Sequence, residues 1–301
     1  MSTTAPEPAH DLSGAWQLTS DLDEFLDRGG DFLRAEPALH TVLLSVTENL
    51  RVRGLRAYGE GPPLFGTYAD ADGTVSGAFL RTPPHRVSVS PVGPEAAGSL
   101  ARLLADAGPD LPGVGAEHAT AEAFSRAWEK HTGAAGALTT RQRLYRLGDL
   151  TPPEPEPPGR ARVATAADRD LLARWHDEFG EAVGERSAAD PGEWADSRIA
   201  YGGVILWESP DGTPAAMAGA TRQVAGQVRV APVYTPAGLR GRGYGGAATV
   251  AVTRAALDAG ADEVLLFTDL ANPTSNGLYQ RIGYRPVGDF AQWDFTATAT
   301  P

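Results

Sequence analysis

The chain has 301 residues, a formal net charge of −12 at pH 7 and no cysteine. This length exceeds what one compact core needs, so two domains are expected. The absence of thiols excludes disulfides, Cys-based metal sites and thiol nucleophiles, and the acidic surplus argues against nucleic acid or an anionic membrane as a partner. The start of the chain lacks the features of a secretion signal, and no window approaches the roughly 18 apolar residues of a membrane span, so a cytoplasmic protein is expected.

The first half predicts a hairpin, a strand and a helix, in that order. Two strands around the turn Asp72-Gly73 are expected in PLFGTYADADGTVSGAFL, a third strand in RVSVSPV, and a helix in AAGSLARLLADAG. Further along, Trp128 in FSRAWEKHTG is interpreted as a core residue. The histidines show no ligand spacing, so no metal site is expected.

A proline-rich segment divides the chain. The residues TPPEPEPPGR, 151–160, favour an extended spacer that cannot continue a helix. The predicted domains are therefore 1–150 and 161–301, joined by this linker.

The second half repeats the order of elements seen in the first. A hairpin is expected in VILWESPDGTPAAMAGAT, a strand in VRVAPV and a helix in GAATVAVTRAALDAG. The closest match aligns Val87–Val92 with Val228–Val233, which indicates an internal duplication. Only the second copy inserts the loop YTPAGLRGRGYG before its helix.

The stretch LRGRGYGG, 239–246, combines glycines with arginines at a predicted helix start, a combination that suits a phosphate group. One interpretation takes Gly241, Gly243 and Gly246 as the GxGxxG of a dinucleotide-binding fold, with Asp269 as the ribose-binding acid. However, the loop does not follow its strand directly and comes after an antiparallel hairpin, and both contexts count against this interpretation.

The same stretch also contains RxxGxG, with Arg240, Gly243 and Gly245 at the defined positions. Together with NPTSNGLYQRIGY, 272–284, it resembles the motifs of the GNAT superfamily of acyl-CoA-dependent N-acyltransferases. The resemblance covers roughly Ala161 to Phe295. It implies an α/β (α+β) fold of two GNAT-like domains, each a mixed, mostly antiparallel sheet flanked by helices.

The resemblance also implies a site for acetyl-CoA as co-substrate. Main-chain amides of the loop would hold the pyrophosphate, and the splayed strand before the loop would hold the pantetheine arm. Tyr279 matches the tyrosine that protonates the departing thiolate. The residues that the resemblance assigns to the coenzyme are Val233, Tyr234, Thr235, Arg240, Gly241, Arg242, Gly243, Tyr244, Gly245, Gly246, Asn272 and Asn276.

Direct attack by an amine in a ternary complex requires a group that removes the amine proton. Candidates on the predicted helix 168–185 are His176, Glu178, Glu181 and Glu185. The sequence leaves all four open, and Glu178 is taken with Tyr279 as a catalytic residue. The acceptor is expected to be a small-molecule or peptide amine, and the acid-rich composition favours a cationic one. The sequence does not fix the oligomeric state.

By the same resemblance, the first half is a degenerate copy, because it lacks the loop motif and carries an acid in GPEAAGS where pyrophosphate would lie. We expect it to bind no coenzyme. Two alternative functions remain open at this point: a non-catalytic acyl-CoA-binding module, and a nucleotide-dependent oxidoreductase that uses the GxGxxG pattern.

Overall fold

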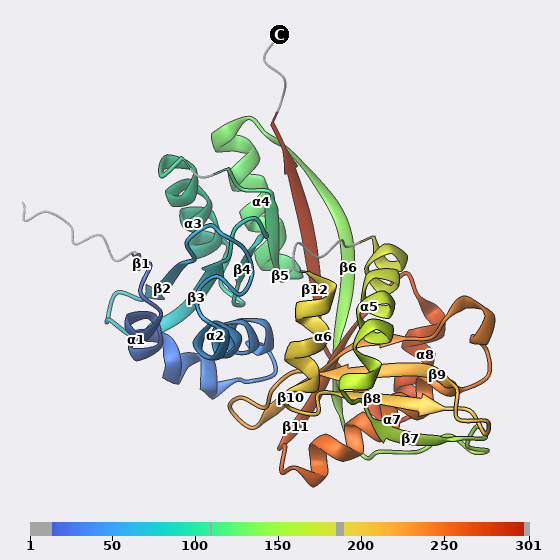
Figure 1. Cartoon of the computed structure of the whole chain (residues 1–301). Coiled ribbons are helices and arrows are strands. Elements are labelled where there is room, and N and C mark those ends of the chain that lie inside the picture. Colours follow the sequence, from blue (N-terminus) through green and yellow to red (C-terminus); the bar gives the residue numbers. More distant parts are fainter. Residues whose placement is uncertain (1–13, 109, 185–189, 298–301) are drawn as a thin grey trace, which may run out of the picture.

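The computed structural model describes residues 14–108, 110–184 and 190–297 (Figure 1). The first half contains β1 (Ala15–Thr19), α1 (Leu22–Ala35), α2 (Thr41–Arg53), β2 (Leu64–Ala69), β3 (Val75–Arg81), β4 (Val87–Val89), α3 (Pro94–Asp106), β5 (Gly113–Glu117), α4 (His118–Thr132) and β6 (Ala135–Leu147). The second half contains β7 (Arg160–Val163), α5 (Arg169–Val183), α6 (Pro191–Ile199), β8 (Val204–Glu208), β9 (Pro214–Ala220), β10 (Gln227–Tyr234), α7 (Tyr244–Asp258), β11 (Glu263–Asp269), α8 (Pro273–Arg281) and β12 (Tyr284–Thr296).

All the strands belong to one sheet, in the order β1-β2-β3-β4-β5-β12-β6-β11-β10-β9-β8-β7. The pairs β4–β5 and β10–β11 are parallel and the other neighbouring pairs are antiparallel. The expected mixed, mostly antiparallel fold of two halves is therefore confirmed. Dinucleotide-binding folds use an open, mostly parallel sheet, so this mostly antiparallel sheet counts against the dinucleotide interpretation.

The two halves exchange their last strands. β12, from the end of the chain, lies between β5 and β6, and β6, from the first half, lies between β12 and β11. The two long strands run side by side through the centre of the molecule (Figure 1). The domain boundary is predicted in the linker 151–160, but the sheet runs continuously from one half to the other.

Helices cover both faces of the sheet in each half. In the second half, one core cluster joins the strands to α7 and α8, and another joins the opposite face to α5 and α6. In the first half, α3 and α4 share one core cluster and α1 and α2 share another. Trp128 is 5 % exposed within the cluster under α3 and α4, which confirms its interpretation as a core residue.

Local sequence explains where several helices begin. The carboxylate of Asp21 accepts hydrogen bonds from the amides of Asp23 and Glu24 and so caps α1. Asp190 caps α6 in the same way, and Pro191 occupies the first helical position, where its missing N–H costs nothing. Within the described ranges, no helix has both the length and the apolar character that a membrane crossing requires.

Candidate active site

β10 and β11 separate halfway along β10. Their parallel pairing ends at Val230 and Leu266, whereas β10 continues to Tyr234 and β11 to Asp269. From residue 231 onward, the edge of β10 that faces β11 therefore has no strand partner among the residues that the structure describes. This parted edge is the main-chain surface to which the family resemblance assigns the pantetheine arm.

A bulge in β10 accounts for the parting. Against β9, Val230 pairs with Ala220 but Val233 pairs with Ala218, so three steps along β10 match two along β9. Pro232 lies inside this bulge and has no N–H to donate to a neighbouring strand. Bulges bend and twist the strand that carries them, which here re-aims the end of β10.

The glycine-rich loop leads from β10 into α7. Gly241 and Gly243 have φ values of 77° and 85°, a region that side chains strongly disfavour. Gly243 is the N-cap of α7 and supplies no side-chain cap. The amides of Tyr244, Gly245 and Gly246 have no acceptor among the described residues. This helix start can therefore bind an anion.

Packing explains the remaining glycines of the motif. A Cβ at Gly246 would lie 2.9 Å from Leu278 of α8, and one at Gly245 would lie 3.0 Å from the hydroxyl of Thr235. The first turn of α7 thus sits close to both α8 and the end of β10. These contacts bring the free amides, the parted edge and α8 together.

Both arginines of the loop make hydrogen bonds to nearby main-chain carbonyls. Arg240 donates from Nε to the carbonyl of Thr235 at 3.0 Å, and Arg242 donates from Nη2 to that of Gly238 at 3.3 Å. Their guanidinium groups place positive charge beside the helix start of α7, which supports anion binding there.

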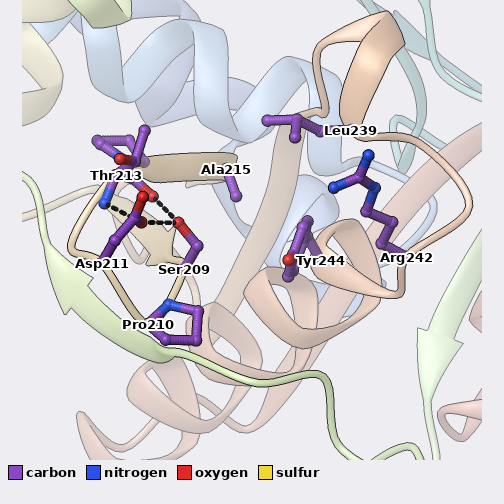
Figure 2. A pocket seen from close by; sticks show the side chains of 9 residues that line it. Ser209, Pro210, Asp211, Thr213, Ala215, Leu239, Arg242 and Tyr244 are labelled. Carbon is purple, nitrogen blue, oxygen red and sulfur yellow. Dashed lines mark hydrogen bonds between the residues drawn. The ribbon is translucent and has the colours of Figure 1, made fainter.

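A cavity of about 390 Å³ adjoins the loop. Figure 2 shows the turn between β8 and β9 forming one wall, where Asp211 accepts hydrogen bonds from Ser209 and Thr213. Arg242 and Tyr244 lie on the opposite wall. The sequence did not assign the turn residues to the site. The Asp-Gly turn marked a hairpin, but nothing local placed that hairpin against the loop.

Tyr279 lies on α8 and is 8 % exposed. Its ring meets that of Tyr284 edge-on, with centroids 6.2 Å apart. Burial raises the pKa of Tyr279 to about 12. Its hydroxyl has no hydrogen-bond partner among the described residues. The side chain is therefore protonated at neutral pH, with its proton available for a ligand.

The two asparagines near α8 hold the chain that joins β11 to α8. Asn272 is the N-cap of α8, and its side-chain oxygen accepts from the amide of Ser275 at 3.0 Å. Asn276 donates to the carbonyls of Asp269 and Asn272 and accepts from the hydroxyl of Tyr145 at 2.9 Å. Both therefore have structural partners, and their contact with a coenzyme stays a prediction.

The acid chosen from α5 contacts the side chain of the last residue of β10. The hydroxyl of Tyr234, at the end of β10, donates to Glu178 Oε2 at 2.7 Å. His176 instead stacks on Trp194 at 4.2 Å between ring centroids, and burial, aided by the charge of Arg198, lowers its pKa.

Of the other candidate bases, Glu181 lies on the exposed side of α5, and Glu185 lies outside the described residues. Glu178 is thus the candidate base that contacts a residue at the end of β10, through its hydrogen bond to the hydroxyl of Tyr234.

In the first half the corresponding edge is already occupied. Val92, the counterpart of Val233, donates its amide to Thr120 Oγ1 at 3.0 Å and accepts from it at 2.9 Å. α3 then begins with Pro94, which has no N–H, and Glu95, whose charge repels phosphate. Thr120 was not predicted, because its role depends on the packing of α4 against the end of β4.

Comparisons with known proteins agree with this geometry. The family model for acetyltransferases of the GNAT family matches residues 169–284. The comparison with curated proteins gives no match. Among solved structures, a GCN5-related N-acetyltransferase from Sphaerobacter thermophilus has 18% identity and a TM-score of 0.57, with 95% of this chain and 97% of that chain covered.

Two further structures have the same fold over the whole length. A tandem GNAT protein from the clavulanic acid biosynthesis pathway has 14% identity and a TM-score of 0.54, with 95% of this chain and 100% of that chain covered. A Drosophila protein has 13% identity and a TM-score of 0.65 at the same coverage. Residues 169–284 of this chain are thus a domain of the GNAT acetyltransferase family, set in a chain that has the fold of tandem GNAT proteins.

Proposed function

We propose that the protein transfers an acetyl or other short acyl group from acetyl-CoA to an amine, by direct attack in a ternary complex. Three features carry this proposal: the unpaired amides at the start of α7, the parted edge of β10, and the unpartnered hydroxyl of Tyr279 on α8, the helix that packs against the start of α7. We expect the enzyme to act in the cytoplasm on a small-molecule or peptide amine.

The fit of the coenzyme rests on the loop. The amides of residues 244–246 and the dipole of α7 favour the diphosphate, and Gly241 and Gly243 allow the turn that presents these amides. The edge at 233–235 offers main-chain groups to the amide-rich pantetheine arm. An amide on this edge would also stabilise negative charge on the thioester oxygen as the amine attacks.

Proton movements are assigned to two side chains. As the carbon–sulfur bond breaks, Tyr279 donates a hydrogen bond to the leaving sulfur. Its pKa of about 12 exceeds the value of roughly 8.5 for a free thiol, so Tyr279 keeps its proton. The sulfur leaves as a thiolate that accepts this hydrogen bond and then takes a proton from water. Glu178, which accepts from the hydroxyl of Tyr234, takes the proton that the attacking amine loses, directly or through water.

The lack of cysteine makes the test simple, because the protein contributes no thiol to a disulfide reagent. Acetyl-CoA is incubated with the protein and a panel of amines, and free thiol is measured. Amine-dependent release at a rate proportional to enzyme supports the proposal. Tight binding of acetyl-CoA without release with any amine would instead indicate a non-catalytic acyl-CoA-binding module.

A further inference from the structure

A second cavity, of about 290 Å³, lies between the two halves of the molecule. Its walls come from α2 and the β3–β4 region of the first half, and from α6, β10 and the segment after β9 of the second. Five arginines line it, against one glutamate: Arg53, Arg86, Arg198, Arg222 and Arg229, with Glu48. Such a concentration of positive charge is unexpected in a chain with a net charge of −12.

Ion pairs neutralise only part of this charge. Arg86 pairs with Asp294 at 2.6 Å and Arg53 with Glu193 at 3.6 Å. The lining glutamate, Glu48, is itself engaged by an arginine of α2 outside the cavity. The arginine cluster, defined as Arg198, Arg222 and Arg229, has no carboxylate within 4.0 Å among the described residues.

The three members of the cluster are held by neutral groups. Arg198 donates to the hydroxyl of Tyr201, and Arg222 lies over the ring of Tyr201 at 4.2 Å. The Nε of Arg222 is buried and has no partner in the described part of the chain.

Arg229 donates to the hydroxyl of Thr41 at 3.2 Å, and burial lowers its pKa to about 10. It therefore stays charged at neutral pH without a counter-ion. Uncompensated charge at partly buried positions costs stability, because the guanidinium groups lose water and repel one another.

The cluster lies on the face of the sheet that also carries α5, the helix of the candidate base Glu178. Val228 and Val230 enter the core beneath α7. Since side chains alternate along a strand, Arg229 points to the opposite face, which α5 and α6 cover. Val233, on the parted edge, is four positions further, roughly 13 Å along the strand. A small molecule can span this interval.

From this arrangement we infer that the cavity binds an anionic group, a carboxylate or a phosphate, of the amine that accepts the acyl group. The inference rests on the proposed acyl transfer, and it gives the acceptor class as acidic amines. Guanidinium groups bind both anions through paired hydrogen bonds. The acidic composition of the whole chain favours a cationic acceptor, but this cavity is positively charged and would repel one.

A binding measurement tests the cavity without depending on catalysis. Glutarate and inorganic phosphate are titrated separately into the full chain by calorimetry and by thermal unfolding. At least one should bind and raise Tm. Arg222→Gln and Arg229→Gln should each weaken that binding about ten- to a hundredfold, the effect of losing a charged hydrogen bond. Arg126→Gln, which removes an exposed arginine of α4, is the matched control and should change nothing.

Stability distinguishes a binding role from a structural one. If Arg229 serves to bind an anion and is uncompensated without one, Arg229→Gln should raise the Tm of the ligand-free protein. The same variant should weaken the binding of glutarate or phosphate. If Arg229 instead holds the fold together, the same variant should lower Tm. A lower Tm, or the absence of any anion binding by the parent, would overturn the inference.

An acceptor series then connects the cavity to the reaction. Aminohexanoate, hexylamine and diaminohexane share an amine and differ in the charge at the far end, and phosphoethanolamine with ethanolamine forms the phosphate pair. Thiol release should be fastest with the acidic member of a series, and Arg222→Gln should erase that preference mainly through KM. Equal rates, or a preference for diaminohexane, would contradict the inference. Anion binding without thiol release from any amine would instead count against acyl transfer and leave the anion site standing.

Discussion

Among single residues, a substitution of Tyr279 tests the catalytic step without disturbing the binding of acetyl-CoA. Tyr279→Phe removes only the unpartnered hydroxyl, so the core packing with Tyr284 is retained. We expect turnover to fall about a hundredfold, the usual effect of losing one hydrogen bond to developing negative charge, while acetyl-CoA affinity by calorimetry stays within roughly twofold of the parent. Tyr284→Phe is the control, because its hydroxyl bonds internally to Thr253 at 2.7 Å. Unchanged turnover in the Tyr279→Phe variant would remove Tyr279 from the mechanism.

Asp168 predicts a pH dependence of stability. It accepts two hydrogen bonds of 2.7 Å from Arg162, which also contacts Glu208, and these hold the pKa of Asp168 at about 2. Because the folded pKa lies below the unfolded value, the stabilisation is complete above about pH 4 and is lost as the pH falls towards 2. Asp168→Asn should therefore lower the free energy of unfolding by about 2 kcal/mol at pH 7.

Urea unfolding at neutral pH and near pH 2 checks this expectation. The difference between parent and Asp168→Asn should shrink at the lower pH, where the carboxyl of the parent becomes protonated. Asp170→Asn, at an exposed position beside Arg169, should have almost no effect at either pH. A difference that is independent of pH would show that Asp168 acts through its shape and hydrogen bonds and not through its charge.

At the scale of elements, the loop and the start of α7 predict one coenzyme per chain. Gly243→Ala places a side chain at a φ of 85° and should distort the turn that presents the free amides. We expect calorimetry to give one acetyl-CoA per chain for the parent and at least a tenfold weaker affinity for this variant. Gly73→Ala carries a similar strain, at a φ of 86°, in a hairpin of the first half, and should keep the parent affinity. A stoichiometry of two would mean that the first half also binds.

Local patterns in the sequence predicted most elements of the second half. The strand VRVAPV, the glycine loop and the helix after it are found as β10, the turn at 241–243 and α7, because each depends on residues close together in the chain. The arginine cluster was not predicted, because its members come from α6, β10 and the segment between β9 and β10 and meet only after folding. In sequence, each is one arginine among many.

In the molecule as a whole, the exchange of strands between the two halves could not be predicted from the sequence either. A strand pattern shows which face of a strand is apolar, but not which strand lies beside it. β6 brings Tyr145 into the core of the second half, where its hydroxyl bonds to Asn276, and Arg143 of β6 pairs with Asp289 of β12 at 2.6 Å. The two copies therefore complete one another, and the cavity between them is part of a single folded body.

Cutting the chain at the linker should consequently disrupt both halves. A fragment 1–150 would carry β6 without either of its neighbours, and a fragment 151–301 would carry β11 and β12 with an open slot between them. Exposed strand edges of this length pair with other chains, so each fragment alone should aggregate or unfold without a cooperative transition. Co-expressed fragments should instead purify as a one-to-one complex that binds acetyl-CoA with the affinity of the intact chain. A monomeric, cooperatively folded fragment 151–301 that binds acetyl-CoA by itself would show that the second half does not need β6.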